Sequence, residues 1–347
     1  MRAVSILLGG LLEAGALMAV ADTATFNACV VDDEYGQPIK DVLVEASFSN
    51  DNGWKAWTES APIFRDRKKT GLDGFCRLSG KTNIGRAGCW VDAPPSGYYR
   101  AGGRSFRFQK KDLFGVWQPD NLVATIRLQR VGRPIPLRVK RVGDHINRSR
   151  VGYVDGTNAV FRFDLVMGDY LPPDGRGEVA DLVFDSRLTD LTTTNVHRRA
   201  RVFYGFENVV SFPGEGNGLV PVATRPTDGI RLRTAPETGY RPTAVLRCGS
   251  RMKVVPPNVL NEPYGDSDPD RCYYFRVRAR HDAQGRLVSC HYGKIYGDFK
   301  IGCWLREGGC SVEFLYYLNP VSLDRNLEWD RKNNLCPNPG RLGERRP

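Results

Sequence analysis

The sequence has no sustained helical periodicity outside its N-terminal end, and it has no repeat of fixed period. It also has no second apolar run long enough to span a membrane. Instead, 37 glycines and 22 prolines are spread along 347 residues, with short apolar runs between them. Many short strands joined by turns are typical of this pattern. The sequence therefore predicts an all-β protein, and its length predicts two domains.

Motifs for catalysis and for metal binding are missing too. There is no G-x-S-x-G element, and no pair of cysteines or histidines has the spacing of a zinc site. Gly74 and Gly80-Lys81-Thr82 are one residue too far apart for a phosphate-binding loop. The acidic stretch 264–270 departs from the EF-hand pattern, so it predicts a solvated turn. We expect no metal, no cofactor and no enzymatic activity.

The N-terminal end is the one long apolar stretch. A minimal basic start, Met1-Arg2, precedes the mostly apolar segment Ala3–Val20, and Ala19-Val20-Ala21 forms an A-x-A cleavage site. Residues 1–21 are therefore predicted to be a signal peptide, with Asp22 as the mature N-terminus. An uncleaved anchor and a buried helix are the alternatives, although one acid interrupts the apolar run. We expect an exported protein, periplasmic, at the cell surface or secreted, with no transmembrane segment after cleavage.

Nine cysteines in an exported chain favour disulfides, because the periplasm and the exterior are oxidising. Cys303 and Cys310 bracket a predicted hairpin that a disulfide could close. The odd number leaves at least one thiol outside an intramolecular bridge, and the spacing does not determine the other pairs.

The net charge of +11 predicts attraction to anionic surfaces. Arginines crowd the region 127–150, where several of them alternate with apolar residues. This alternation favours the solvated faces of strands over a dedicated binding patch. We expect no nucleic-acid partner.

Residues 26–130 are predicted to form the first domain. An alternating strand over 42–48 places one set of apolar side chains on a single face, as a half-buried strand requires. This set is Val42, Val44, Ala46 and Phe48. A polar loop follows, and it carries Trp54 and Trp57.

A turn is predicted at Thr70-Gly71-Leu72-Asp73-Gly74-Phe75. Asp73-Gly74 is a hairpin-type pair, because glycine supplies a positive φ without steric cost. The predicted role of Thr70, Asp73, Gly74 and Phe75 is architectural. The turn should fix a hairpin register in which Phe75 and the 42–48 strand meet in one core.

Four stretches, in this order and spacing, resemble the carboxypeptidase regulatory-like domain: Ala28–Asp32, Gly36–Ile39, Val42–Val44 and Thr70–Phe75. The resemblance covers the first third of the chain. It implies an Ig/transthyretin-like β-sandwich that serves as an accessory domain in exported bacterial proteins and carries no catalytic residues. The family is grouped with folds that include starch-binding modules.

The second domain is predicted over 131–336 and is again β-rich. Its clearest strand is Phe275–Arg280, where alternation should point every arginine outward. This part resembles the C-terminal region of exported bacterial proteins that pair with the same first domain, and the resemblance implies no activity. Residues 337–347 are predicted to be a disordered tail.

These observations predict a non-catalytic interaction module of the envelope or the exterior, whose partner is another envelope protein or a polysaccharide. In the carbohydrate-binding alternative, Trp54 and Trp57 stack on sugar rings. A third hypothesis is a glycan hydrolase, since such enzymes need two facing carboxyl groups and the 164–185 region is rich in acids. Its proposed pair is Glu178 and Asp181.

Overall fold

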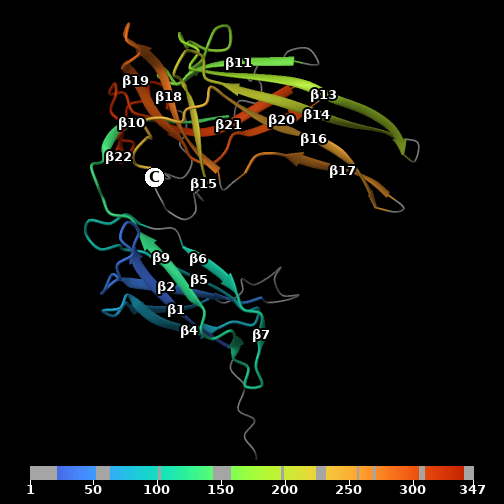
Figure 1. Cartoon of the computed structure of the whole chain (residues 1–347). Coiled ribbons are helices and arrows are strands. Elements are labelled where there is room, and N and C mark those ends of the chain that lie inside the picture. The colour runs from blue at the N-terminus through green and yellow to red at the C-terminus, as the bar shows by residue number, and fades with distance from the viewer. Residues whose placement is uncertain are drawn as a thin grey trace, which may run out of the picture. The chain divides into compact units, whose positions relative to one another are not determined.

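The computed structural model describes residues 22–51, 63–100, 103–143, 158–196, 199–223, 232–255, 258–268, 271–304 and 309–339. The predicted signal peptide, Trp54 and Trp57, and most of the predicted tail lie outside these ranges. The described residues are all-β and contain no helix, which confirms the predicted fold class (Figure 1). Among them, accordingly, no helix is long and apolar enough to cross a membrane.

The chain divides into two compact units. Unit 1 comprises Met1–Val31, Gln37–Pro94 and Gly103–Ile126, and unit 2 comprises Asp32–Gly36, Pro95–Gly102 and Arg127–Pro347. The earlier strands are β1 (Thr23–Asp32), β2 (Leu43–Ser49), β3 (Phe64–Lys69), β4 (Phe75–Lys81), β5 (Arg86–Val91), β6 (Arg104–Arg107), β7 (Lys110–Lys111), β8 (Trp117–Gln118) and β9 (Val123–Leu128).

Unit 1 is a sandwich of two antiparallel sheets, with strand orders β4-β1-β9 and β3-β2-β5-β6. The sheets meet through aromatic rings. Phe26 on β1 lies 5.8 Å from Phe48 on β2 and 4.6 Å from Phe106 on β6, measured between ring centroids. The predicted inward face of the 42–48 strand is confirmed, because its four apolar side chains are fully buried.

The turn at Thr70–Phe75 exists, and Gly74 has the expected positive φ of 76°. The prediction that it closes a hairpin is wrong. β3 pairs with β2, whereas β4 pairs with β1, so the turn passes from one sheet of the sandwich to the other. An Asp-Gly pair specifies a tight reversal of the backbone, and the strand partners on either side are chosen by contacts distant in sequence.

Phe75 does not enter the core; its side chain is 40% exposed. Cys76 and Leu78 face inward instead. Thr70 makes the link to the neighbouring strand, because its buried hydroxyl donates to the Ile39 carbonyl (2.7 Å) and accepts from the Val42 N–H (3.0 Å). The turn is therefore attached to the segment that leads into β2 by a threonine hydroxyl and not by a phenylalanine ring.

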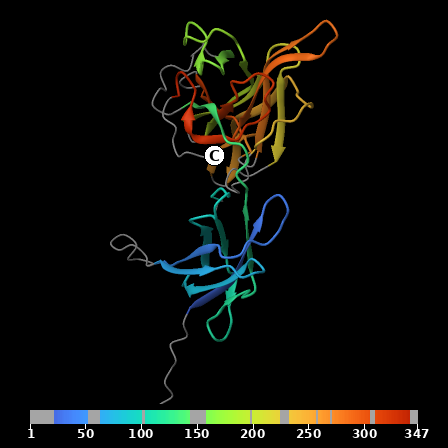
Figure 2. The ribbon, with the colours of Figure 1, turned by 90° about the vertical axis from the view of Figure 1, so that its left-hand side faces the viewer.

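Unit 2 is a larger sandwich (Figures 1 and 2). One sheet has the order β15-β18-β19-β21-β10-β22, with β20 also paired to β21, and the other has the order β12-β11-β13-β14-β16-β17. The strands are β10 (Ile135–Val142), β11 (Asn158–Asp164), β12 (Asp169–Tyr170), β13 (Leu182–Val196), β14 (Arg199–Ser211), β15 (Gly218–Ala223), β16 (Thr243–Val255), β17 (Asn258–Gly265), β18 (Arg271–His281), β19 (Leu287–Ile295), β20 (Lys300–Trp304), β21 (Gly309–Leu318) and β22 (Trp329–Asn334).

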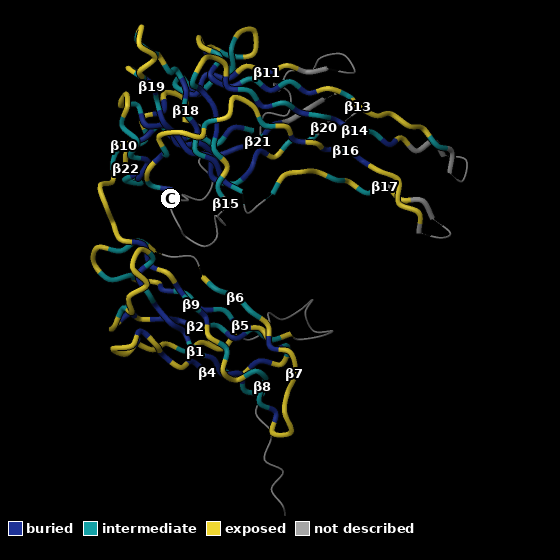
Figure 3. The backbone as a smooth tube through the Cα atoms, in the orientation of Figure 1, coloured by how far each residue is buried: buried dark blue, intermediate teal, exposed yellow. Residues whose placement is uncertain are grey.

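Aromatic side chains from both sheets fill the core of unit 2. Phe314 on β21 lies 5.9 Å from Phe163 on β11 and 5.8 Å from Phe184 on β13. The distal parts of β13, β14, β16 and β17 extend beyond this core as an exposed ribbon (Figures 1 and 3). Backbone pairing continues along the ribbon, so the extension offers an ordered surface that the core does not cover.

Seven cysteines have described side chains, and all seven are buried outside any disulfide. These residues are Cys29, Cys76, Cys89, Cys248, Cys272, Cys290 and Cys336. Burial raises the pKa of the Cys76 thiol to about 11 and that of the Cys89 thiol to about 12, so both stay protonated and unreactive at neutral pH. The expectation that export favours disulfides is therefore wrong for these seven residues.

Cys303 and Cys310 stay a predicted disulfide, because their side chains lie outside the described set. Their backbones are directly opposite each other in the β20–β21 hairpin. We expect one bridge in the exported protein. In the denatured protein, mass spectrometry should then find two more alkylated thiols after reduction than before it. Replacing both residues by alanine should lower the free energy of unfolding by about 2.5 kcal/mol, since the bridge closes a short loop. Alkylation of all nine thiols in the denatured, unreduced protein would contradict the bridge.

Candidate functional site

The acids proposed for glycan hydrolysis differ in their surroundings and in their partners. Asp181 is buried and bound to Arg278, whereas Glu178 is exposed. Asp169 accepts backbone N–H groups of Tyr170 and Arg176, and Asp185 pairs with Arg187 at 2.6 Å. Asp181 is thus committed to an ion pair that Glu178 does not share.

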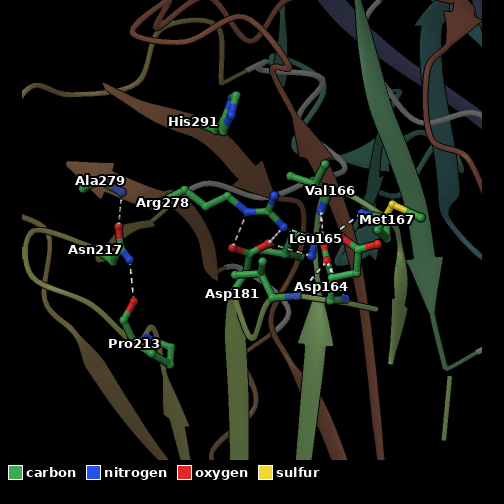
Figure 4. Close-up of polar contacts among 12 residues, drawn as sticks. Asp164, Leu165, Val166, Met167, Asp181, Pro213, Asn217, Arg278, Ala279 and His291 are labelled. Atoms are coloured by element: carbon green, nitrogen blue, oxygen red, sulfur yellow. Dashed lines mark hydrogen bonds and ion pairs between the residues drawn. The ribbon is translucent and has the colours of Figure 1, made fainter. Parts of the chain in front are cut away.

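Arg278 on β18 binds two buried carboxylates at once (Figure 4). Its Nε donates to Asp181 Oδ1 at 2.9 Å, and its Nη2 donates to Asp164 Oδ1 at 2.7 Å and to Asp181 Oδ2 at 3.0 Å. The Arg278 side chain is 27% exposed, and both carboxylates are almost fully buried. One guanidinium therefore balances two charges that the protein interior disfavours.

Backbone N–H groups complete the shell of Asp164. Its Oδ1 accepts from Val166 and Met167 at 2.9 Å each, and its Oδ2 accepts from Glu178 at 3.0 Å and Val179 at 3.1 Å. Burial alone would raise the pKa of Asp164, but these bonds and the Arg278 charge outweigh it and lower the pKa. The Asp164 carboxylate thus ties together the backbone segments at 166–167 and 178–179.

Asp181 differs, because burial dominates and raises its pKa, with the nearby Asp164 charge acting in the same direction. Its Oδ2 also accepts the Leu165 N–H at 3.0 Å. His291, on the neighbouring strand in Figure 4, has its pKa lowered chiefly by burial, and its Nδ1 lies 3.3 Å from the Asn319 carbonyl. These groups support the fold of unit 2.

Sequence periodicity missed Arg278. The pairing of β18 with β19 shifts between Val277 and Arg280, and Arg278 has a positive φ of 55°. This bulge turns the side chain inward, so the prediction that every arginine of this strand points outward is wrong. Arg280 two residues later is exposed, as predicted.

A recess of about 410 Å³ lies on the ribbon of β13, β14, β16 and β17. Its lining residues are Asp190, Thr192, Thr194, Phe203, Tyr204, Ser250, Arg251, Met252 and Tyr264. The register pairs Asp190 with Gly205, Gly205 with Gly249, and Gly249 with Tyr264, so these four positions share one face of the sheet. The core residues Phe206 and Cys248 alternate with them, so these four positions lie on the face opposite the core. The lining residues Tyr204, Ser250 and Met252 alternate with this face and border the recess from the other side of the sheet.

Two glycines make room for the tyrosine ring that crosses this face. A Cβ at Gly205 would lie 2.8 Å from the Tyr264 hydroxyl. One at Gly249 would collide with the Tyr204 carbonyl oxygen and lie 2.9 Å from the Tyr264 ring. Tyr264 therefore occupies space that any other residue at these positions would fill. Burial raises the pKa of Tyr264, so its hydroxyl is neutral at physiological pH and can both donate and accept a hydrogen bond.

Polar side chains surround the aromatic residues of the recess. Phe203 is buried, and its cross-strand neighbour Thr192 is exposed. Arg251 is fixed by Glu262, which accepts its Nε at 2.9 Å and Lys253 Nζ at 2.6 Å. The recess thus offers ring faces, hydroxyls and one exposed carboxylate, Asp190. In the described part of the chain no group of three or more His, Cys, Asp or Glu residues could hold a metal ion.

Nothing in the comparisons assigns a family: no protein-family model matches the sequence, and no curated protein matches it. Solved structures give remote likenesses only. The shaft pilin SpaA of Lactobacillus rhamnosus GG is 10% identical with a TM-score of 0.23, over 57% of this chain and 90% of that one.

Two further likenesses cover less of the compared protein. The minor pilin GBS52 of Streptococcus agalactiae is 19% identical with a TM-score of 0.23, over 34% of this chain and 49% of that one. The 3-chlorocatechol 1,2-dioxygenase of Rhodococcus opacus is 16% identical with a TM-score of 0.24, over 32% of this chain and 61% of that one. The chain thus spans about half to three fifths of these two proteins, and scores this low say nothing of function.

Proposed function

We propose that this chain is an exported, non-catalytic binding module whose ligand site is the recess on the β13–β14–β16–β17 ribbon. In this proposal unit 1 is a carboxypeptidase regulatory-like accessory domain, as the sequence resemblance suggests. The observation that carries the proposal is the position of Tyr264 across Gly205 and Gly249, on a face that faces away from the core. The two cross-strand glycines let the Tyr264 ring lie against the strand surface, as a glycine within a strand commonly marks a close approach.

A saccharide is the ligand class that fits the lining best. Sugar rings present C–H groups to aromatic faces and hydroxyls to carboxylates and to side-chain hydroxyls. Tyr264 supplies the aromatic surface, Asp190 an exposed carboxylate, and Thr192 a hydroxyl. A protein partner would be expected to bury a larger, more apolar surface than these residues provide.

Replacing Tyr264 by alanine should weaken glycan binding about tenfold or more, because the stacking surface is lost. Isothermal titration calorimetry of the wild type against a polysaccharide panel selects the ligand, and the variant is then titrated with it. Tyr35, an exposed tyrosine outside the recess, gives the matched control Y35A, which should bind as the wild type does. The proposal fails if no glycan gives heat with the wild type, or if Y264A and Y35A bind equally well.

A further inference from the structure

The hairpin of β7 and β8 in unit 1 ends in two bulky apolar side chains that no described residue covers. Leu113 is 97% exposed and Phe114 is 79% exposed. The apex is coloured as exposed in Figure 3. Single exposed apolar residues are ordinary, but two adjacent ones at the end of a projecting turn mark a surface that meets an apolar environment.

The turn that carries them is held in one conformation. Asp112 Oδ1 accepts the N–H groups of Phe114 and Val116 at 2.9 Å each. The Asp112 N–H donates to the Val116 carbonyl at 2.9 Å, and the Gly115 N–H donates to the Asp112 carbonyl at 3.1 Å. Because the turn is already ordered, little conformational freedom is lost when the apex binds.

Directly behind the apex stand an amphipathic aromatic residue and two cations. Lys111 pairs with Trp117 across the hairpin, and its Nζ lies 4.8 Å from the centroid of that ring. Trp117 Nε1 donates to the Thr82 carbonyl at 2.7 Å, and Lys110 is exposed. The order from the apex inward is therefore aliphatic and phenyl groups, then indole and ammonium groups.

The environments that these side chains prefer follow one another in the same order across a membrane interface, from the acyl chains to the headgroups. Apolar groups prefer the acyl region, tryptophan prefers the headgroup boundary, and lysine reaches for the headgroup phosphates. We propose that Leu113 and Phe114 insert into the surface of an anionic lipid bilayer, with Lys110 at the headgroups. A pocket on a protein partner could also accept the two apolar side chains, but it gives no reason for the indole and the lysines behind them.

Two acids lie near the apex, and both have partners. The Asp112 carboxylate is occupied by backbone N–H groups and by Gln118 Nε2 at 3.3 Å, and Asp22 is paired with Lys111 at 2.8 Å. Arg107, on the strand that precedes the hairpin, is exposed and adds a further cation. The inference concerns unit 1 alone and does not depend on the recess of unit 2.

Vesicle co-sedimentation tests the proposal. The chain from Asp22 onward is used, because it keeps every described residue and lacks the apolar N-terminal segment, which would bind lipid by itself. The wild type should bind phosphatidylcholine vesicles more tightly when they contain phosphatidylglycerol. The double variant L113S/F114S should bind both at least about tenfold more weakly, and K110Q should lose mainly the phosphatidylglycerol dependence.

Leu72 provides the matched control. It is 83% exposed on another turn of the same unit, so L72S removes an equally exposed leucine and should bind vesicles as the wild type does. Wild-type protein that stays in the supernatant with both vesicles overturns the proposal, as does L113S/F114S that sediments like the wild type. A crosslinking experiment distinguishes insertion into a lipid bilayer from insertion into a protein. A photoreactive phenylalanine derivative at position 114 that crosslinks in cells to protein and not to lipid would overturn the lipid assignment.

Discussion

Replacing Arg278 by methionine is expected to lower the free energy of unfolding by about 3–5 kcal/mol. The substitution keeps much of the aliphatic length but removes the one guanidinium that binds both Asp164 and Asp181. Two nearly fully buried carboxylates would then remain without a countercharge, and leaving buried charges unpaired is among the most destabilising changes in a protein. Urea denaturation followed by circular dichroism measures the effect.

Arg280 gives the control for this prediction, because it lies on the same strand and is exposed. R280M should change the stability by no more than about 0.5 kcal/mol. The stability of R278K should lie between those of R278M and R280M. A lysine keeps the charge, but it cannot donate hydrogen bonds to both carboxylates in the planar geometry of a guanidinium. Equal stabilities of R278M and R280M would mean that the ion-pair cluster does not support unit 2.

Replacing Gly74 by alanine should lower the free energy of unfolding by about 2–4 kcal/mol. Two effects add. A positive φ of 76° strains any residue with a Cβ, and that Cβ would lie 2.7 Å from the Val30 carbonyl oxygen and 2.9 Å from Pro38 Cβ. The Val30 N–H donates to the Gly74 carbonyl at 2.9 Å, so the turn cannot shift away without losing this bond.

Gly36 separates the two effects. Its φ is 67°, and nothing lies within 4 Å of the Cβ that an alanine would add. G36A should therefore show the backbone strain alone, about 1 kcal/mol. If G74A costs no more than G36A, the close approach of Val30 and Pro38 does not hold the inter-sheet turn in place.

Local patterns sufficed for the strands and for the conformation of single turns. The 42–48 strand and the positive φ at Gly74 follow from alternation and from the chemistry of glycine. Strand partners did not follow from these patterns, because sheet pairing depends on residues far apart in sequence. The Asp73-Gly74 turn therefore joins two sheets where a hairpin was predicted, and Phe75 is exposed as a consequence.

In unit 2, the alternation of side chains along a strand fails at the arginine of the ion-pair cluster. Arg278 turns inward at a bulge that no alternation rule marks. The recess did leave a trace in the sequence, because Gly205 and Gly249 each interrupt an otherwise regular strand, and an isolated glycine in a strand indicates close approach of another group.

Hydroxyl-radical footprinting in the presence and absence of the selected glycan tests the central claim most directly. The two candidate surfaces carry residues that oxidise readily, Tyr264 at the recess and Trp54 and Trp57 in the predicted loop. We expect ligand to protect Tyr264 while both tryptophans oxidise as before. Protection of Trp54 and Trp57 with unchanged oxidation of Tyr264 would contradict it and move the binding site to unit 1.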